Sequence, residues 1–424
     1  MAKKTINKEL TGAQDLYNFL FEACNIIRGP VSQDNFKDYI TPLLYYKRIS
    51  DVYDEETEEA LISSGGDKEY ASLPEQHRFV IPDGCHWQEV RERTENLGAA
   101  IVGAMRQIEI ANPDTLYGVL SMFSSQKWTN KAILNDSKIR DLIEHLSKRK
   151  LGNKDYPADL MGDAYEILLK KFADDSKAQA GEFYTPRSVV RLLVHILDPQ
   201  PGETVYDPAC GSGGMLIEAI RYMHDDSLCC GSIFGQEKNV VNAAIAKMNL
   251  FLHGASDFNV MQGDTLRDPK ILQGGNIAKF DCIIANPPFS LENWGATEWS
   301  SDKYKRNIYG TPSDSCGDYA WIQHMICSMS SGKGRMAVVM PQGILFRGNQ
   351  EAEIRKQLVE SDLIEAVVTL GDKLFYGTGL SPCFLIIRRM KQAHHSGRIL
   401  MIDGSKILTQ KRAQNILEEN DIDR

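Results

Sequence analysis

The sequence lacks any long apolar run. No stretch reaches about 18 consecutive apolar residues, the length that a membrane-spanning helix needs. Its first ten residues, MAKKTINKEL, lack the apolar core of a secretory signal peptide. With 42% hydrophobic and 25% charged residues in a chain of 424, the composition is that of an ordinary globular protein of two or three domains. We therefore expect no membrane segment and a cytoplasmic location.

Paired cysteine motifs are also missing. The nine cysteines include no CxxC pair, and several lie inside apolar runs such as FDCIIA and SPCFLII. The adjacent Cys229 and Cys230 make a poor metal clamp, because neighbouring side chains in a regular element point in different directions. We expect reduced structural thiols and no metal site.

Positive charge is scarce. The chain has 48 Lys and Arg against 57 Asp and Glu, a formal net charge of −9. A protein that binds nucleic acid strongly by itself presents a basic surface to the phosphates. The charge balance therefore argues against strong nucleic-acid binding by this chain alone, although local basic patches remain possible.

The spacing of apolar residues changes near residue 160. Before that point apolar residues recur at helical intervals, as in residues 16–27 and 139–146. After it, short β-rich runs alternate with helical patterns, which is typical of a mostly parallel sheet with helices on both faces. We predict an all-helical domain over residues 1–155, an α/β domain over 156–395, and a strand and helix extension over 396–424.

Four successive strands of the predicted sheet end at or just before a polar residue. These residues are Asp207, Glu237, Asp264 and Asn286. Ligands of such sheets collect at the carboxyl ends of the strands. A single acidic residue at a strand end more often caps the following helix. Four in succession indicate a ligand site along this edge.

The loop after the first of these strands, DPACGSGG at 207–214, is rich in glycine. Glycine permits a positive φ or a close approach to a ligand, and the helix that follows offers free N–H groups. The spacing is not GxGxxG and no lysine follows, which excludes a Walker-type P-loop. Glu237, 23 residues after Gly214, is placed to accept hydrogen bonds from ribose hydroxyls.

The fourth strand stops at the tetrapeptide NPPF, residues 286–289. Pro287 and Pro288 have a fixed φ and no N–H, so the backbone there is rigid and its carbonyls have no ladder partner. By itself this pattern is more often an ordinary strand stop. Beside three other polar strand ends, it indicates a binding edge with stiff acceptors and an aromatic plane.

These motifs resemble a known family. DPACGSGG, NPPF and the upstream GEFYTPRSVV at 181–190 are similar to the S-adenosylmethionine-dependent N6-adenine DNA methyltransferases, and their order resembles the modification subunits of Type I restriction-modification systems. The resemblance continues through GDYAWIQHM, VVMPQGILF and TGLSPCFLII, and it includes the N-terminal helical region. NPPF alone is less specific, because protein-glutamine and some ribosomal-RNA methyltransferases carry a similar tetrapeptide. The implied fold is a Rossmann-like methyltransferase sheet with an N-terminal all-helical domain.

The resemblance implies methyl transfer from S-adenosylmethionine to N6 of adenine in a specific DNA sequence. The Asn286 side-chain oxygen and the Pro287 carbonyl would each accept an N–H of the amino group, and Phe289 would stack on a base rotated out of the duplex. The implied catalytic residues are Asn286, Pro287, Pro288 and Phe289. The implied cofactor residues are Glu182, Phe183, Tyr184, Thr185, Pro186, Arg187, Asp207, Gly211, Ser212, Gly213, Gly214, Glu237 and Asp264. Local helix signals also predict Thr185 as an N-cap and Pro186 as the first residue of the helix that follows.

Partners follow from the same resemblance. They are double-stranded DNA, a specificity subunit bound by two copies of this chain, and a restriction subunit in the full complex. The strands expected at 335–341, 363–370 and 383–389 use most of the sequence after the tetrapeptide, which leaves little for a recognition domain. The N-terminal helices either contact DNA or other subunits, or pack on the catalytic domain. Family members usually continue further than Arg424, so we expect a longer natural chain.

Two other classes remain open on the sequence. One is a protein N5-glutamine methyltransferase, and the other is a non-catalytic assembly subunit with a methyltransferase fold. A stand-alone DNA methyltransferase is a third alternative within the first class. The identity of the methyl acceptor, DNA or protein, separates these enzymes, and cofactor binding tests the non-catalytic alternative.

Overall fold

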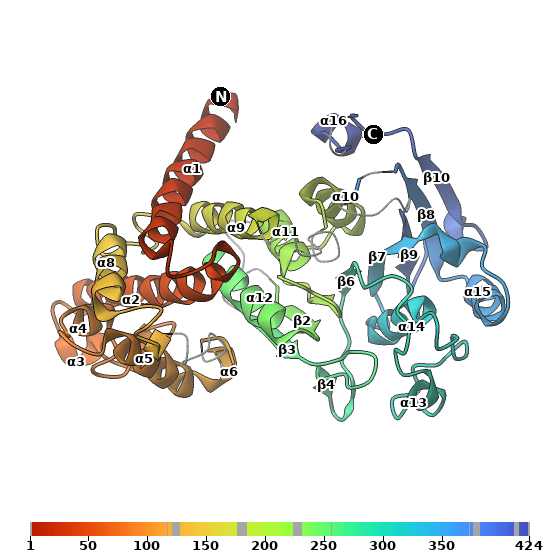
Figure 1. The fold of residues 1–424 in the computed structure, drawn as a ribbon. Helices are drawn as coiled ribbons and strands as arrows, with labels where there is room; N and C mark the ends of the chain where they lie inside the picture. Colours follow the sequence, from red (N-terminus) through yellow and green to blue (C-terminus); the bar gives the residue numbers. More distant parts are fainter. Residues whose placement is uncertain are drawn as a thin grey trace. The chain divides into compact units, whose positions relative to one another are not determined.

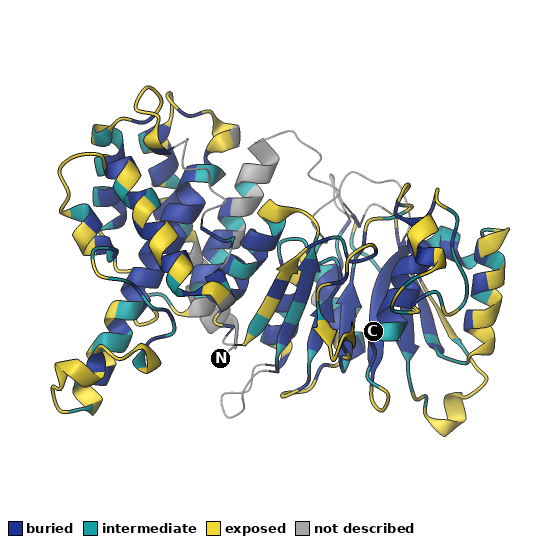
Figure 2. Ribbon diagram, turned by 90° about the horizontal axis from the view of Figure 1, so that it is seen from below, coloured by how far each residue is buried: buried dark blue, intermediate teal, exposed yellow. Residues whose placement is uncertain are grey.

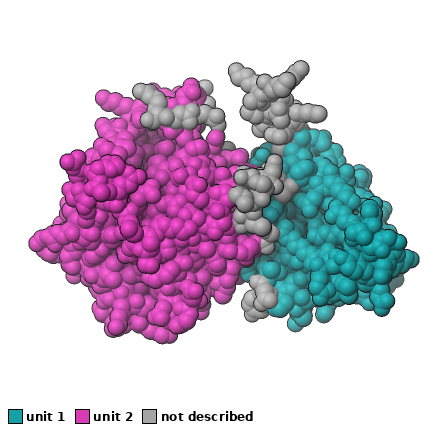
Figure 3. Space-filling view, turned by 180° about the vertical axis from the view of Figure 1, so that it is seen from behind, with its two compact units in different colours: residues 1–178, 247–254 teal, residues 179–246, 255–424 magenta. Residues whose placement is uncertain are grey.

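The computed structural model describes residues 2–116, 118–120, 128–175, 185–223, 231–255, 257–372, 374–375, 382–410 and 415–422. The chain divides into two compact units (Figure 3): residues 1–178 with 247–254, and residues 179–246 with 255–424. We call these unit 1 and unit 2. Within the ranges given above, none of the helices combines the length and the apolar character needed to cross a bilayer.

The elements of unit 1 that precede residue 176 are helical. They are α1 (Ala2–Ile27), α2 (Lys37–Ser63), α3 (Lys68–Ala71), α4 (Trp87–Arg91), α5 (Leu97–Ala111), α6 (Pro113–Leu116), α8 (Asp136–Leu146) and α9 (Ala158–Asp175), with short 3-10 turns at Gln33–Asn35 and Pro74–Gln76. The apolar stripe of α8, which includes Ile139 and Leu142, is buried as its spacing predicts. The Asn135 side chain caps this helix by accepting the Lys138 N–H at 3.0 Å.

Unit 2 contains an eight-stranded sheet (Figure 1). Its strands are β1 (Val205–Asp207), β2 (Ile233–Glu237), β3 (Phe258–Gln262), β6 (Cys282–Ala285), β7 (Arg335–Pro341), β8 (Ile364–Leu370), β9 (Pro382–Arg388) and β10 (Leu400–Gly404). The order across the sheet is β10-β8-β9-β7-β6-β1-β2-β3, and only β9 runs antiparallel to its neighbours. A small separate hairpin pairs β4 (Leu272–Gln273) with β5 (Asn276–Ile277).

The strand order places a switch point between β1 and β6. From β1 the chain adds β2 and β3 on one side, and then returns to place β6 on the other side of β1. Val205 of β1 is in register with Ile233 of β2 and with Cys282 of β6. Ligands bind outside the carboxyl ends of the strands at such a reversal, so the topology locates the site before any side chain is considered.

Helices cover both faces of this sheet. The helices of unit 2 are α10 (Arg187–Leu197), α11 (Gly214–Met223), α12 (Val240–Leu252, whose last residues belong to unit 1), α13 (Ala296–Ser300), α14 (Asp318–Ser328), α15 (Gln350–Glu360) and α16 (Glu419–Ile422), with 3-10 turns at Gln342–Leu345 and Ala393–His395. Helices α10 and α11 pack on one face, over β1, β6 and β7. On the other face α14 and α15 form a core cluster with alternate residues of the strands, among them Ile283, Met336 and Val338. The central strands are buried along their length (Figure 2).

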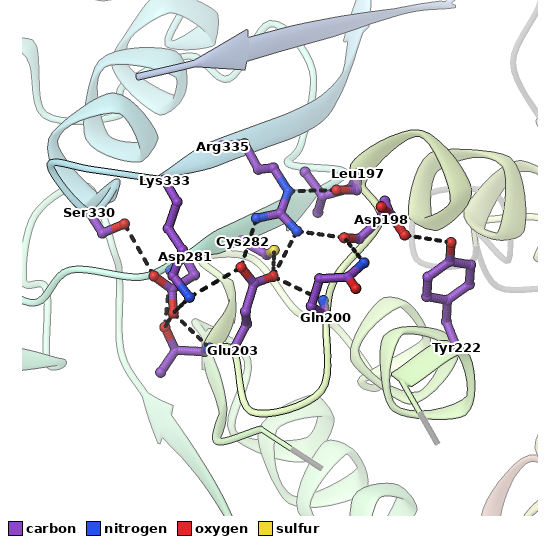
Figure 4. A network of polar contacts seen from close by, with 11 residues as sticks. Leu197, Asp198, Gln200, Glu203, Tyr222, Asp281, Cys282, Ser330, Lys333 and Arg335 are labelled. Carbon is purple, nitrogen blue, oxygen red and sulfur yellow. Dashed lines mark hydrogen bonds and ion pairs between the residues drawn. The ribbon is translucent and has the colours of Figure 1, made fainter. Parts of the chain in front are cut away.

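A buried ion pair ties the amino ends of these strands together (Figure 4). Arg335, the first residue of β7, forms two hydrogen bonds with the Glu203 carboxylate, at 2.7 and 3.1 Å. Its Nε donates to the Leu197 carbonyl at 2.6 Å, at the end of α10. The free carbonyls of a helix C-terminus need such donors, so this arginine joins β7, the approach to β1 and α10.

The structure corrects one local expectation. Helix α10 begins at Arg187 with Pro186 as its N-cap residue, and no side chain caps it. The prediction that Thr185 is the N-cap and Pro186 the first residue of the helix is therefore wrong by one position. The Thr185 hydroxyl has another partner, described below.

Candidate active site

A cavity of about 480 Å³ opens at the carboxyl ends of β1, β2, β3 and β6. Nine of the residues proposed from the sequence line it: Thr185, Asp207, Gly211, Ser212, Gly214, Glu237, Asp264, Asn286 and Pro288. The four polar strand ends therefore do share one site. They converge because parallel strands place their carboxyl ends along the same edge.

The glycine loop forms one wall of the cavity. Gly211 and Gly213 have φ values of 53° and 85°, a region that side chains other than glycine rarely adopt. The Gly213 N–H donates to the Cys210 carbonyl at 2.8 Å, and α11 then begins at Gly214. The loop therefore ends with the first turn of a helix, whose N–H groups have no partner within the helix.

Glu237, at the end of β2, faces this loop. Its carboxylate accepts the Gly211 N–H at 2.9 Å and the Asn239 N–H at 2.7 Å. Burial raises the pKa of Glu237, although these backbone N–H groups oppose the rise. A carboxylate with two backbone donors still has lone pairs for hydroxyl donors of a ligand.

Asp207, at the end of β1, is almost fully buried, with 2% of its surface exposed. One carboxylate oxygen accepts the Ala209 N–H at 2.9 Å. Burial raises the pKa of Asp207 to about 8; the Ala209 N–H opposes this rise and the nearby charge of Glu237 adds to it. The two carboxyl groups of this edge therefore differ in environment, since Asp207 is the more enclosed.

Asn286 presents an unusual pair of polar atoms. Its Nδ2 donates to the Thr185 hydroxyl oxygen at 2.8 Å. Its Oδ1 is buried, and none of the described residues donates a hydrogen bond to it. Buried acceptors without a partner are rare in folded proteins, and those that exist are often explained by function. The side chain is thus held through its nitrogen while its oxygen is left for a donor.

Two family models match this chain. The N-6 DNA methylase model matches residues 156–424, and the HsdM N-terminal domain model matches residues 16–146. The chain belongs to the N-6 DNA methylase family.

Individual relatives agree with this assignment. The chain is 34% identical to the Type I restriction enzyme MjaVII methylase subunit of Methanocaldococcus jannaschii over 403 residues, which cover 90% of this chain and 67% of that protein. It is 27% identical to the Type I restriction enzyme EcoKI methylase subunit of Escherichia coli, over 88% of this chain and 67% of that one. A solved structure, the methyltransferase subunit of a type I restriction-modification system from Streptococcus thermophilus, matches with a TM-score of 0.81 at 26% identity, covering 97% of this chain and 91% of that chain.

These matches confirm the resemblance drawn from the motifs. The protein is an S-adenosylmethionine-dependent N6-adenine DNA methyltransferase of the Type I methylase kind. The Rossmann-like fold with an N-terminal helical domain is also confirmed. The roles of individual residues rest on the geometry of this methylase alone.

The remaining candidates of the methylase are placed less directly. Asp264 lines the cavity, but one of its oxygens accepts the N–H groups of Leu266 and Arg267, and the other pairs with Lys238 at 2.9 Å. Four candidates are described but are not among the lining residues: Pro186, Arg187, Gly213 and Pro287. Phe289 is likewise not among them and is half-buried. Glu182, Phe183 and Tyr184 lie outside the described residues.

A polar network holds the backbone just after NPPF, and residue-by-residue reading of the sequence missed it. Ser290 has a φ of 50°, and its N–H donates to the fully buried Asp318 carboxylate at 2.7 Å. Arg347 in turn donates to Asp318 at 2.7 Å and to the Ser290 hydroxyl at 3.2 Å. The only signal among them was that Asp318 lies in GDYAWIQHM, which belongs to the family resemblance; Ser290 and Arg347 lie just outside the quoted motifs.

Trp321 is a second missed residue. It lies on α14, lines the cavity, and is 6% exposed. Its indole N–H is buried and, among the described residues, has no acceptor. The spacing of Trp321 on a helix predicts a core residue, and most of its side chain does pack in the core cluster.

Proposed function

We propose that the cavity holds S-adenosylmethionine and that Asn286 Oδ1 receives the N6 amino group of the target adenine. The observation that carries this proposal is the buried Oδ1, which has no partner among the described residues, on a side chain whose Nδ2 already donates to Thr185. An acceptor kept free at the edge of this cavity matches what an amino-group substrate needs.

The chemistry of the lining fits the cofactor. A volume of about 480 Å³ lies in the usual range of small-molecule sites. Glu237 supplies acceptors for the ribose hydroxyls, while the start of α11 supplies N–H donors. Asp207 and Asp264 line the same cavity, although the Asp264 oxygens already have partners. When bound, S-adenosylmethionine supplies an electrophilic methyl group on a sulfonium sulfur.

The chain's own residues prepare the nucleophile. The lone pair of the adenine amino group is delocalised into the ring, so the nitrogen is a poor nucleophile in its planar form. Asn286 Oδ1 and the Pro287 carbonyl, each accepting one N–H, favour a pyramidal nitrogen with its lone pair available. Pro287 and Pro288 fix the backbone that carries these acceptors beforehand, because their φ angles are fixed. Phe289, half-buried in the same turn, is the stacking face for a base rotated out of the duplex.

Substitution of Asn286 tests this proposal. We expect Asn286→Ala to lower methyl transfer to DNA by roughly 10²-fold or more, since it removes one preorganised acceptor. Affinity for S-adenosylmethionine should stay within a few-fold, because Asn286 acts on the nucleophile. The measurements are transfer of labelled methyl groups to unmethylated DNA and cofactor titration by calorimetry.

The matched control is Asn276→Ala, an exposed asparagine in the β4–β5 hairpin of the same unit. It should leave both quantities unchanged. Near-normal turnover of the Asn286→Ala variant would remove Asn286 from the reaction. A wild-type protein that labels protein and not DNA would overturn the function itself.

Partners belong to the same proposal. The relatives that carry the family name are methylase subunits of Type I restriction enzymes. We propose that this chain likewise acts on double-stranded DNA in the cytoplasm with a specificity subunit, as two methylase chains for each specificity subunit, and with a restriction subunit in the full complex. The net charge of −9 supports a need for a partner that supplies DNA affinity.

A further inference from the structure

The amide of Asn286 has two orientations of nearly the same shape. They differ by a half-turn of the side-chain amide, which exchanges Oδ1 and Nδ2. Only one of them is productive, because a donor N–H of adenine needs Oδ1 and is repelled by Nδ2. The tetrapeptide fixes the backbone of Asn286, but two prolines cannot decide which way its amide points.

The partner of Nδ2 comes from a distant part of the chain. Thr185 lies just before α10, 101 residues earlier in the sequence than Asn286, and its hydroxyl oxygen is 2.8 Å from Nδ2. Thr185 and Asn286 both line the cavity. The same residue therefore borders the cofactor pocket and contacts the side chain assigned to the acceptor base.

We propose that Thr185 is a positioning residue that sets the orientation of the Asn286 amide. Its hydroxyl oxygen gives the partly buried Nδ2 an acceptor, so Oδ1 stays free for the target amino group. This inference rests on the proposed role of Asn286. It assigns to Thr185 a function distinct from helix capping, which the structure rules out, and from cofactor contact alone.

Loss of the hydrogen bond between Thr185 and Asn286 should slow the reaction. Without the Thr185 oxygen, the productive orientation leaves a partly buried N–H without its acceptor. Turning the amide around to avoid this presents Nδ2 to the adenine amino group. In either case the cost arises when the target base is bound. The cost of one unpaired donor corresponds to a loss of turnover of roughly 10-fold.

The test compares two substitutions, one that removes the hydroxyl of Thr185 and one that keeps it. Thr185→Val keeps the shape and removes the acceptor, whereas Thr185→Ser keeps the acceptor. We expect Thr185→Val to lower turnover at saturating S-adenosylmethionine by roughly 10-fold. Its dissociation constant for the cofactor should stay within about 3-fold of the wild-type value, since only one neutral hydrogen bond is involved. Thr185→Ser should have a turnover close to that of the wild type. The assays use the chain with its specificity subunit, unmethylated DNA and calorimetric titration of the cofactor.

The Asn286→Asp variant shows whether Thr185→Val acts through the orientation of the amide or through a general structural defect. In Asn286→Asp the side chain has two equivalent oxygens and no orientation to set. The loss caused by Thr185→Val should therefore shrink to about 3-fold or less in that background, because the two changes remove one shared interaction. An equal loss in both backgrounds would show that Thr185 does not act through the amide and would overturn the inference.

Other outcomes also decide against it. A Thr185→Val variant that binds the cofactor more weakly but turns over normally when saturated would make Thr185 a cofactor contact only. A serine variant as impaired as the valine variant would exclude the hydroxyl as the cause. These results leave the proposed function standing as long as the wild-type protein labels DNA and Asn286→Ala does not.

Discussion

Two carboxyl groups at neighbouring strand ends have different environments. Asp207 is enclosed, with a pKa raised to about 8 by burial, whereas Glu237 is half-buried and accepts two backbone N–H groups. A folded pKa above the unfolded value means that the folded state binds the proton more tightly. The stability that Asp207 contributes is therefore complete below about pH 4 and is lost as pH rises through about 8.

This difference yields a prediction for Asp207→Asn. The amide keeps an acceptor for the Ala209 N–H but never ionises. We compare the free energy of unfolding of the variant with that of the wild type. This difference should be more favourable to the variant at pH 9 than at pH 5, by more than about 1 kcal/mol, since one pKa unit corresponds to about 1.4 kcal/mol. Urea unfolding at the two pH values measures the gain. The exposed Asp314→Asn is the control, and an equal gain there would assign the effect to net charge.

Glu237 yields a prediction about the cofactor. Glu237→Ala should weaken S-adenosylmethionine binding by roughly 10-fold or more, because it removes a charged acceptor for the ribose hydroxyls. Turnover at saturating cofactor should fall much less. Asp264→Asn is the comparison, with a smaller expected effect, since the Asp264 oxygens are already occupied by Lys238 and two N–H groups. Unchanged calorimetric affinity of the alanine variant would remove Glu237 from the cofactor site.

Local patterns located some of these residues and missed others. Asp207, Glu237 and Asn286 could be predicted because a strand end is visible in the sequence and parallel strands share an edge. Thr185 was misassigned because its partner lies 101 residues away, and a threonine before a proline looks like a helix cap. Asp318 accepts the Ser290 N–H and Arg347 donates to Asp318 and the Ser290 hydroxyl, and no local sequence spacing predicts these contacts.

At the scale of elements, α14 and the segment after β7 support the turn that follows NPPF. Ser290 holds a left-handed φ of 50°, which is unfavourable for a residue with a side chain. Asp318, the first residue of α14, accepts its N–H, and Arg347 neutralises the buried carboxylate. The two elements thus stabilise a backbone conformation that the turn does not favour by itself.

Removing Arg347 should loosen this support. We expect Arg347→Met to lower turnover several-fold while cofactor affinity stays within about 3-fold, since the turn lies beside the acceptor and not at the glycine loop. Arg347→Lys should be intermediate, because lysine keeps the charge but loses the planar fork that reaches both Asp318 and Ser290. Equal turnover in all three proteins would mean that Asp318 alone holds the turn.

The amino ends of the strands depend on the Arg335–Glu203 pair. Burial works against ionisation of Glu203, but hydrogen bonds from Arg335 and the Gln200 N–H lower its pKa to about 2. A folded pKa below the unfolded value means that this stabilisation is present above about pH 4.5 and is lost as pH falls toward 2.

Arg335→Met should therefore destabilise the fold strongly at neutral pH. We expect a loss of about 3 kcal/mol or more, because a buried carboxylate is left without its partner. The loss should be smaller at pH 3, where Glu203 of the variant is protonated. Lys333→Met is the control, since Lys333 is 63% exposed at the side chain and such pairs contribute less than about 1 kcal/mol. Similar losses of unfolding free energy for Arg335→Met and Lys333→Met would show that burial of Arg335 does not strengthen its pairing with Glu203.

The sequence also showed its limits at this scale. All eight strands of the sheet fall in regions where strands were expected, because apolar β-rich runs are conspicuous. The antiparallel direction of β9 could not be predicted, since an apolar run reads the same either way. The β4–β5 hairpin was not expected, because two-residue strands have no detectable period.

At the scale of the whole molecule, the boundary between the two compact units differs from the boundary of the methylase family model. Unit 1 extends to residue 178 because α9 packs along α1, whereas the methylase family model begins at residue 156. Residues 247–254 also belong to unit 1, where Phe251 lies edge-on to Tyr45 and Phe79. The boundary at residue 155 stays a prediction. Contacts between residues so far apart in sequence cannot be read from local periodicity.

Reading a DNA sequence requires contacts to base edges together with a positive surface for the phosphates. The chain carries a net charge of −9, and the strand ends nearest the acceptor supply the acidic residues Asp207, Glu237 and Asp264. The described strands β7 to β10 complete the sheet, and α14 and α15 cover it. We therefore predict that this chain methylates a defined site efficiently only with a specificity subunit.

The measurement is methylation of one duplex that contains the target and of another that lacks it, by the chain alone and by the reconstituted complex. The complex should favour the target duplex by at least about 10³-fold, the usual lower range of specific over non-specific DNA binding, and its mass should correspond to two methylase chains for each specificity subunit. Any residual activity of the chain alone should be indifferent to sequence and should fall steeply with salt, because only phosphate contacts would remain. Asn286→Ala in the complex controls for contaminating activity. Efficient, target-selective methylation by the purified chain would show that it reads the bases itself, and the need for a partner would then be withdrawn.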